Sequence, residues 1–148
     1  MPVLSPFAYN TTAYEKAAIA KKAMSTLPPG TAVVCVELPS GPSGTDPYFK
    51  VDAASTTDVV FAVVSATSPP GTTPPSITDK AFGKIVLLNA ALIPVLLSAA
   101  GTKDQYVKVK TADGKWGPIG AGETGVARLV EDGAAGDIVF AMPVQFKP

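Results

Sequence analysis

The sequence predicts a mainly β protein, a small antiparallel β-barrel or sandwich with one N-terminal helix and an extended N-terminal arm. Valine-rich runs bounded by proline and glycine clusters favour strands, and the last third of the chain reads as two consecutive hairpins. The length of 148 residues is typical of one domain that buries its own core. A change in composition near Pro28 divides it into an arm and helix appendage, residues 1–30, and a β-rich domain, residues 31–148.

The first ten residues read as an extended arm, because prolines occupy positions 2 and 6. This segment has neither a basic region nor an apolar core of signal-peptide length, so we expect synthesis and retention in a cytoplasm. The arm suits docking on another protein surface. Its candidate contact residues are Val3, Leu4, Phe7 and Tyr9.

A helix is predicted over Ala13–Met24. Thr12 and Glu15 have the spacing of a capping box, lysines fall in the last turn, and Pro28 follows. The apolar stripe of this helix consists mostly of small residues, which pack closely but bury little area. We therefore expect the helix to depend on a partner surface for its stability.

Strands are predicted from residue 31 onward. The clearest are Thr31–Leu38 and Val59–Thr67, with a short strand at Tyr48–Val51 and another within Ile77–Leu88. Periodicity does not decide whether Leu92–Ala99 is a strand or a short helix. The loops between these segments, rich in Pro, Gly, Ser and Thr, are expected on the surface.

The most hydrophobic segment, Ile85–Ala100, approaches the roughly 17–25 residues that a membrane-spanning helix requires. Asn89 and Pro94 interrupt it, and no aromatic belt flanks it. We interpret the segment as protein interior and expect no association with a membrane.

The first hairpin is predicted over Tyr106–Ile119, with Asp113-Gly114 at the centre of a tight type I′ turn. The second covers Gly125–Pro143 and differs because its return strand, Ile138–Met142, is apolar on both faces. Such a strand requires cover on both sides, either from another layer of this chain or from another subunit. The candidate residues of a subunit interface are Ile138, Phe140 and Met142.

Reactive side chains are scarce, which argues against an enzyme. The chain has no histidine and a single cysteine, Cys35, which lies in a valine run and reads as a small buried hydrophobe. Twelve basic and twelve acidic residues give no net charge, so we do not expect nucleic acid as a partner. No metal-binding loop or phosphate-binding motif is present, and no cofactor is expected.

The remaining candidates have a structural interpretation beside a functional one. Glu131 and Asp132 precede a turn, where acidic residues commonly solvate the end of a hairpin. A carboxylate pair such as Glu37 with Asp52 is neither favoured nor excluded by the sequence. Trp116 beside a hairpin turn more often packs across the strand pair than stacks on a sugar.

The stretch Gly125–Ala141, and Ala135-Gly136-Asp137-Ile138-Val139 within it, resembles the terminal hairpin of small decoration, or cement, proteins of tailed-bacteriophage capsids. This resemblance covers about a quarter of the chain. It implies a β-rich structural subunit of the virion that assembles as a homo-oligomer, commonly a trimer. It also implies binding to the major capsid protein on the exterior of the phage head, which stabilises the shell. The predicted helix departs from the simplest members of that family.

Two other classes of function stay open. One is a carbohydrate- or surface-binding β module of a phage or bacterium, which would grip its ligand through Trp116, Tyr48 and Tyr106. The other is a hydrolase with an acidic pair, which predicts loss of activity when one carboxylate is replaced.

Overall fold

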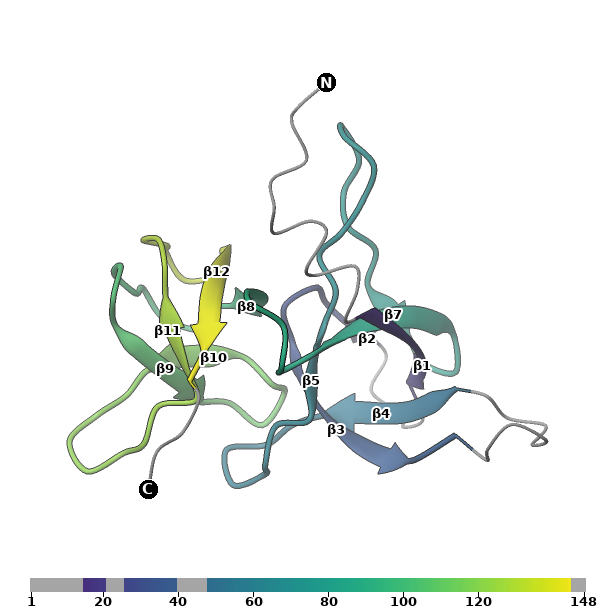
Figure 1. Cartoon of the computed structure of the whole chain (residues 1–148), viewed down its shortest axis with the longest axis horizontal. Coiled ribbons are helices and arrows are strands. Elements are labelled where there is room, and N and C mark those ends of the chain that lie inside the picture. The colour runs from purple at the N-terminus through teal and green to yellow at the C-terminus, as the bar shows by residue number, and fades with distance from the viewer. Residues whose placement is uncertain (1–14, 21–25, 40–47, 145–148) are drawn as a thin grey trace.

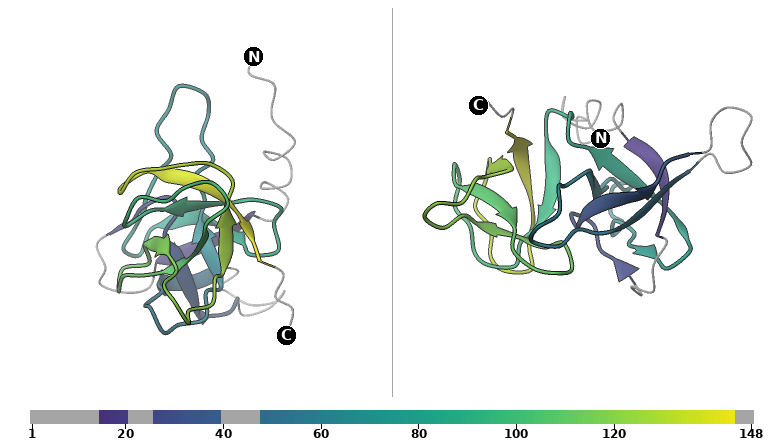
Figure 2. Two further views of the ribbon diagram at one scale, coloured as in Figure 1. Left: turned by 90° about the vertical axis from the view of Figure 1, so that its left-hand side faces the viewer. Right: turned by 90° about the horizontal axis from the view of Figure 1, so that it is seen from below.

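The computed structural model describes residues 15–20, 26–39 and 48–144, and within these ranges the chain consists of strands and loops. Two β regions lie side by side along the long axis of the molecule (Figures 1 and 2). The prediction of a mainly β protein is confirmed. In chain order the strands are β1 Glu15–Ala20, β2 Thr26–Leu27, β3 Ala32–Glu37, β4 Phe49–Ala53, β5 Ala62–Val64, β6 Ile77–Thr78, β7 Phe82–Leu87, β8 Ile93–Leu96, β9 Tyr106–Val109, β10 Trp116–Pro118, β11 Ala127–Leu129 and β12 Ile138–Pro143.

The first region is a closed barrel in the order β1-β4-β3-β5-β7. All of its strand pairs are antiparallel except β1 with β4. The short β2–β6 pair packs on the barrel and contributes the fully buried Leu27 and Ile77 to its core. Small and β-branched side chains fill the rest of this narrow interior, among them Ala18, Val33, Val51, Ala62, Val64 and Ile85.

The prediction of a helix over Ala13–Met24 is wrong in the part that the structure describes, because residues 15–20 form strand β1. β1 pairs with β7 over five residues and with β4 over three, so it closes the barrel. The sequence of β1 is rich in helix-favouring Ala, Lys and Glu, but this local preference is weak beside two ladders of hydrogen bonds. Ala18, within β1, is fully buried in the core of the barrel.

The second region is a five-stranded antiparallel sheet in the order β10-β9-β11-β12-β8. Its two edges approach each other where Leu97 forms an isolated parallel bridge with Trp116. The Ser98 backbone N–H donates to the carbonyl oxygen of Trp116 over 2.6 Å, and the Ser98 hydroxyl donates to the same oxygen over 2.9 Å. The sheet therefore curls into a half-barrel around its own core.

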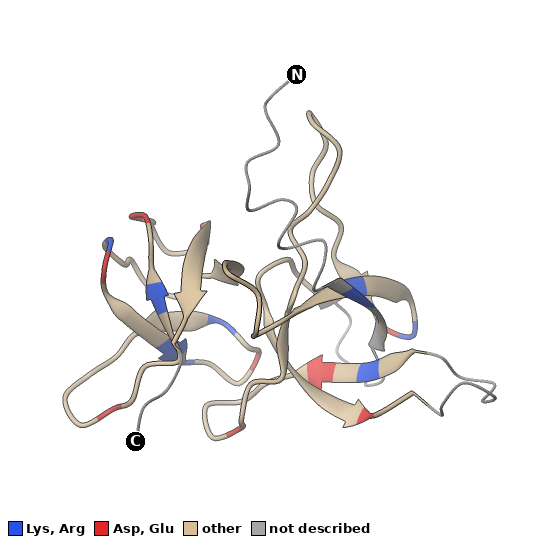
Figure 3. Cartoon of the chain, viewed as in Figure 1, with Lys and Arg blue, Asp and Glu red and all other residues tan. Residues whose placement is uncertain are grey.

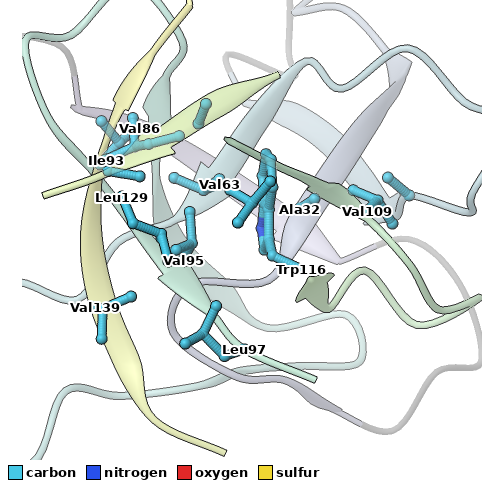
Figure 4. Close-up of a cluster of buried hydrophobic side chains, with 14 of the residues drawn as sticks. Ala32, Val63, Val86, Ile93, Val95, Leu97, Val109, Trp116, Leu129 and Val139 are labelled. Carbon is cyan, nitrogen blue, oxygen red and sulfur yellow. The ribbon is translucent and has the colours of Figure 1, made fainter. Parts of the chain in front are cut away.

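A single hydrophobic cluster joins the two regions. Ala32, Val63 and Val86 of the barrel pack with side chains of the sheet around Trp116, which is fully buried (Figure 4). The indole Nε1 of Trp116 donates to the carbonyl oxygen of Gly30 over 3.1 Å. The Gly30 N–H donates to Val64 O of the barrel, and the Leu96 N–H of the sheet donates to Gly30 O. Gly30 is thus one of the backbone connections between the two regions, and the Ala32 N–H, which donates to Gly114 O over 2.9 Å, is another.

The strands predicted from residue 31 onward are present. Leu92–Ala99 contains strand β8, and most of Ile85–Ala100 is interior, as expected. Nowhere in the described ranges is there a helix with the length and apolar character needed to cross a membrane. Cys35 departs from the expectation, because it is half-buried where β3 emerges from the core.

Both predicted hairpins are confirmed, since β9 pairs with β10 and β11 with β12. The prediction of a type I′ turn in the first hairpin, between β9 and β10, is wrong. That turn needs positive φ at both central residues, but of Asp113 and Gly114 only Gly114 has it, at 82°. Its four-residue loop is closed by the Gly114 N–H donating to Thr111 O. A Cβ on Gly114 would lie 2.5 Å from Ala32 O, so the hairpin tip packs against the barrel.

Candidate interaction surface

Strand β12 presents an apolar row to solvent. Its residues alternate, so that Val139 and Ala141 are buried while Ile138, Phe140 and Met142 are 41%, 40% and 36% exposed. No second layer within the described ranges encloses this row. The candidate subunit-interface residues therefore share one accessible face of one strand.

Neighbouring strands extend this face. Residues directly opposite one another in a sheet share a face, and Arg128 of β11 lies opposite both Met142 of β12 and Tyr106 of β9. Tyr106 is 45% exposed. Val130 follows Arg128 by two residues, and its N–H donates to Phe140 O over 3.1 Å. The surface of these side chains is called the outer face below, and it comprises Tyr106, Arg128, Val130, Ile138, Phe140 and Met142.

The loop that leads into β12 holds this strand in place through hydrogen bonds. Gly136 N–H donates to Leu97 O over 2.8 Å, and Leu97 N–H donates to Asp137 O over 2.9 Å. An Asp137 carboxylate oxygen accepts from the Ala134 N–H over 2.8 Å. The outer face is consequently carried by a braced strand rather than by a free loop.

Glu131 and Asp132 have structural partners at this hairpin. Glu131 Oε2 accepts from the Phe140 N–H over 3.1 Å, and Asp132 Oδ1 accepts from the Lys103 N–H over 2.7 Å. These bonds support the structural interpretation of the two acids. They also tie the segment at Glu131 and Asp132 to Phe140 of β12 and to the turn at residues 101–105.

A charged cluster beside the outer face consists of Lys108 of β9, Lys110 just after this strand, and Glu123. Glu123 forms ion pairs with Lys110, at 2.5 Å, and with Lys108, at 3.3 Å. The hydrogen bond from Lys110, followed by one from the Gly120 N–H, lowers the pKa of Glu123 to about 2. Glu123 is therefore an ionised acceptor that neutralises two lysines, and it lacks the raised pKa of a catalytic acid.

The three aromatic residues proposed for carbohydrate binding are not brought together. Trp116 is fully buried, so neither face of its indole ring is accessible to a ligand. Tyr48 precedes β4 in the barrel and packs against Phe82 with ring centroids 4.6 Å apart. Tyr106 belongs to the outer face of the sheet. The packing role of Trp116 is confirmed.

A groove of about 540 Å³ opens between β7 and the loop that joins β5 to β6, which projects from the barrel (Figure 1). Phe82, 64% exposed, lies on one side of it. Hydroxyl groups and prolines of the loop line the other side. The lining residues are Ser65, Thr67, Ser68, Pro69, Thr72, Thr73, Pro75, Ser76, Phe82, Gly83 and Lys84.

Glu37 and Asp52, the acidic pair considered from the sequence, each have a partner in the structure. Glu37 forms an ion pair with Lys50 at 3.1 Å, and Asp52 accepts a hydrogen bond from the Ala53 N–H over 2.9 Å. Within the described ranges no three His, Cys, Asp or Glu residues are grouped to hold a metal ion. The predicted arm contacts, which are Val3, Leu4, Phe7 and Tyr9, lie outside the described residues.

Sequence reasoning found three members of the outer face and missed the others. Arg128 and Tyr106 occur in separate hairpins, so only the strand register shows that they are neighbours. Their alternation with buried Ala127 and Val107 was the available signal. This alternation predicts that Arg128 and Tyr106 point outward, but it does not predict that they are neighbours.

No family model matches the chain, and no curated protein matches it. Among solved structures, the fold is similar to the head fiber gp8.5 N base of bacteriophage phi29, with a TM-score of 0.56. The match covers 90% of this chain and 96% of that one, at 15% sequence identity. The similarity therefore extends over both β regions and concerns the fold.

Proposed function

We propose that this protein is a structural component of a bacteriophage head, a decoration subunit that binds the outside of the shell as an oligomer and stabilises it. The observation that carries this proposal is the fold shared with a phage head fiber base over nearly the whole length of both chains. The terminal hairpin that resembles decoration proteins supports it independently. The proposed role requires no catalysis, no cofactor and no nucleic acid.

The outer face is the proposed contact between subunits. Isolated exposed apolar residues are common on proteins, but a contiguous group on adjacent strands marks an interaction surface. Burial of apolar area contributes about 25 cal/mol per Å² toward association, and this contribution opposes the entropy lost when subunits combine. We propose a cyclic trimer, in which each subunit offers Ile138, Phe140 and Met142 to its neighbour.

The arm, residues 1–10, is the proposed contact with the major capsid protein. Each arm carries only a few apolar side chains and would bind weakly by itself. Three arms on one oligomer raise the effective concentration at the shell, so their weak contacts combine.

The test uses undecorated heads and purified protein. We expect the full chain to co-sediment with heads and to raise the temperature at which they release their contents. A variant without residues 1–10 should keep its circular dichroism spectrum and bind heads more weakly. Heads that bind neither form would refute the proposed role, and equal binding of the two forms would refute the role of the arm.

A surface-binding module is the second candidate, favoured by the groove beside Phe82. Hydroxyl groups next to an exposed aromatic ring offer both hydrogen bonds and a stacking surface for a sugar. Saturable binding of a glycan that is lost in Phe82→Ala, in the absence of heads, would support this candidate over the first.

A further inference from the structure

We propose that the groove beside Phe82 binds the arm, residues 1–10 of the same chain, as an extended segment and holds it there until the shell takes it up. The holding role rests on the proposed function, in which the arm binds the major capsid protein. The groove contact itself rests on the geometry of the barrel and on the position of the arm in the chain.

Strand β7 presents an open backbone edge to the groove. The pairing of β5 with β7 ends at Val64 opposite Ile85, and one further hydrogen bond runs from the Ser65 N–H to Lys84 O over 2.9 Å. Backbone polar groups alternate sides along a strand, so those of Phe82 point the same way as those of Lys84. The loop has left β7 by then, and among the residues that the structure describes no backbone hydrogen bond joins this loop to Phe82. The N–H and carbonyl group of Phe82 therefore face the groove.

An extended polypeptide is the ligand that this edge fits. Such a segment adds to an open strand edge through backbone hydrogen bonds, and its side chains enter neighbouring pockets. The exposed ring of Phe82 and the prolines at 69 and 75 offer apolar contacts to those side chains. Of the lining residues only Lys84 carries a charge, and the projecting loop carries none (Figure 3). The groove thus favours an uncharged, apolar segment.

The sequence of the arm has this character. Residues 1–14 contain no charged side chain, so entry into the groove removes no charged side chain of the arm from water. Pro2 and Pro6 favour extended backbone at their own positions and at the residue before each, which lowers the entropy lost on docking. The apolar side chains that the arm brings to the groove are Val3, Leu4, Phe7 and Tyr9.

The arm is also long enough to reach the groove. It leads through residues 11–14 into β1, where Glu15 lies opposite Val86 of β7. Val86 and Phe82 are four residues apart on this strand, a distance of about 13 Å. A segment of 14 residues spans up to about 46 Å, which is enough to turn back along β7. Because the arm is tied to β1, its local concentration at the groove is of millimolar order, far above that of another copy at micromolar concentration.

Occupancy of the groove lowers the apparent affinity of the arm for the shell. An arm that is docked most of the time is available only for the remaining fraction, and the apparent dissociation constant rises by the inverse of that fraction. Several arms that bind one shell together overcome this cost, whereas a single arm does not. The groove thus suppresses arm contacts of free subunits and favours binding to the assembled lattice.

Amide hydrogen exchange of Phe82 in the full-length chain, followed by NMR, tests the groove contact. In Leu4→Ser/Phe7→Ser this amide should exchange at least about tenfold faster than in the parent chain, because the arm no longer covers it. Val59→Ser, at an exposed apolar residue outside the groove, is the matched control and should exchange at the parent rate. Unchanged circular dichroism and melting temperature would show that both variants fold.

Three results would overturn the groove contact. The first is equal exchange at Phe82 in the parent chain and in Leu4→Ser/Phe7→Ser. The second is protection that rises with protein concentration, which would place the arm of a second copy in the groove, since a contact within one chain does not depend on concentration. The third is equal exchange together with saturable binding of a glycan at Phe82, which would assign the groove to the surface-binding module.

Binding of the same proteins to undecorated heads tests the holding role separately. Phe82→Ser keeps the arm but weakens the groove, so it should bind heads about three- to tenfold more tightly than the parent chain. Head binding that depends on the arm but is unchanged in Phe82→Ser would overturn the holding role. A chain whose arm protects Phe82 but which ignores heads would contradict the proposed function and leave the groove contact standing.

Discussion

The barrel and the five-stranded sheet expose apolar side chains in different ways. In the barrel, the exposed hydrophobic residues are scattered over several elements, such as Val36 in β3, Val59 in the loop before β5 and Phe82 at the start of β7. Lys50 of β4 lies opposite Glu37 of β3 and forms an ion pair with it. In the sheet, three exposed apolar residues alternate along one strand, and Tyr106 lies nearby on the same face.

The comparison shows that the arrangement of exposed apolar residues is more informative than their number. The side chain of Phe82 is more exposed than that of Phe140, 64% against 40%. Phe140, however, belongs to a contiguous, braced surface, and Phe82 packs mainly against one neighbouring ring. We therefore propose that subunits associate through the sheet. The following experiments test this comparison of the two regions.

The largest effect on stability is expected from a substitution in the core that the two regions share. Trp116→Ala removes the central side chain of the shared core and should lower the free energy of unfolding by about 3–5 kcal/mol. Urea denaturation followed by circular dichroism measures this loss. Trp116→Phe keeps an aromatic ring but cannot donate to Gly30 O, so we expect a smaller loss. A loss below about 1 kcal/mol in Trp116→Ala would mean that the regions fold without a common core.

Gly30→Ala tests one of the backbone connections between the regions. Gly30 has a φ of 82°, and a Cβ on it would lie 2.6 Å from the Leu96 backbone nitrogen. We expect about 2–4 kcal/mol of destabilisation from positive φ and forced separation together.

Gly71→Ala is the matched control for this substitution. Gly71 has a φ of 79° but no atom within 4 Å of the added Cβ, so it isolates the cost of positive φ, about 1 kcal/mol. Equal midpoints for the two variants in urea would show that the contact between Gly30 and β8 is unimportant.

Two phenylalanines, one in each region, separate association from folding. Phe140→Ser should weaken self-association by about 10- to 100-fold, because it places a hydroxyl group in the apolar contact. Phe82→Ser, in the barrel, should leave association unchanged although its ring is the more exposed. Sedimentation velocity over a range of protein concentrations compares the two. The reverse ranking would move the subunit contact to the barrel.

The smallest effect on stability is expected from the charged cluster around Glu123. The pKa of Glu123 is about 2 in the folded chain and near its ordinary value of 4.5 in the unfolded chain. The ionised form therefore stabilises the fold above about pH 4.5, and this contribution disappears as the pH falls toward 2. Because the cluster is exposed to solvent, the change should be small.

Carbon-13 NMR of the Glu123 carboxyl group measures this pKa directly. In Glu123→Gln, the urea midpoint should depend less on pH between 4.5 and 2 than in the parent chain. A titration of Glu123 near its ordinary value would show that the lysine contacts do not persist in solution.

The hairpins could be predicted because their signals are local. The Asp113-Gly114 turn and the alternation in β9 specify a strand pair without information from distant residues. The turn type was mispredicted because Gly114 packs against Ala32 of the barrel, a contact that no neighbouring residue reveals. Strand β1 was missed for the same reason, since its partners β7 and β4 lie far along the chain.

The candidate surface was predictable in part. The apolar outward residues of β12 could be identified from its two apolar faces. The place of Arg128 among them depends on register across three strands, which a single sequence does not specify. A cation in one hairpin and an apolar row in its return strand become one site only after folding.

Sedimentation equilibrium of the full chain tests most directly whether the outer face is a contact between subunits. One chain has a mass of 15.1 kDa. Across micromolar concentrations the account predicts a single associated species with three times this mass. A single species of the chain mass at every concentration would contradict it.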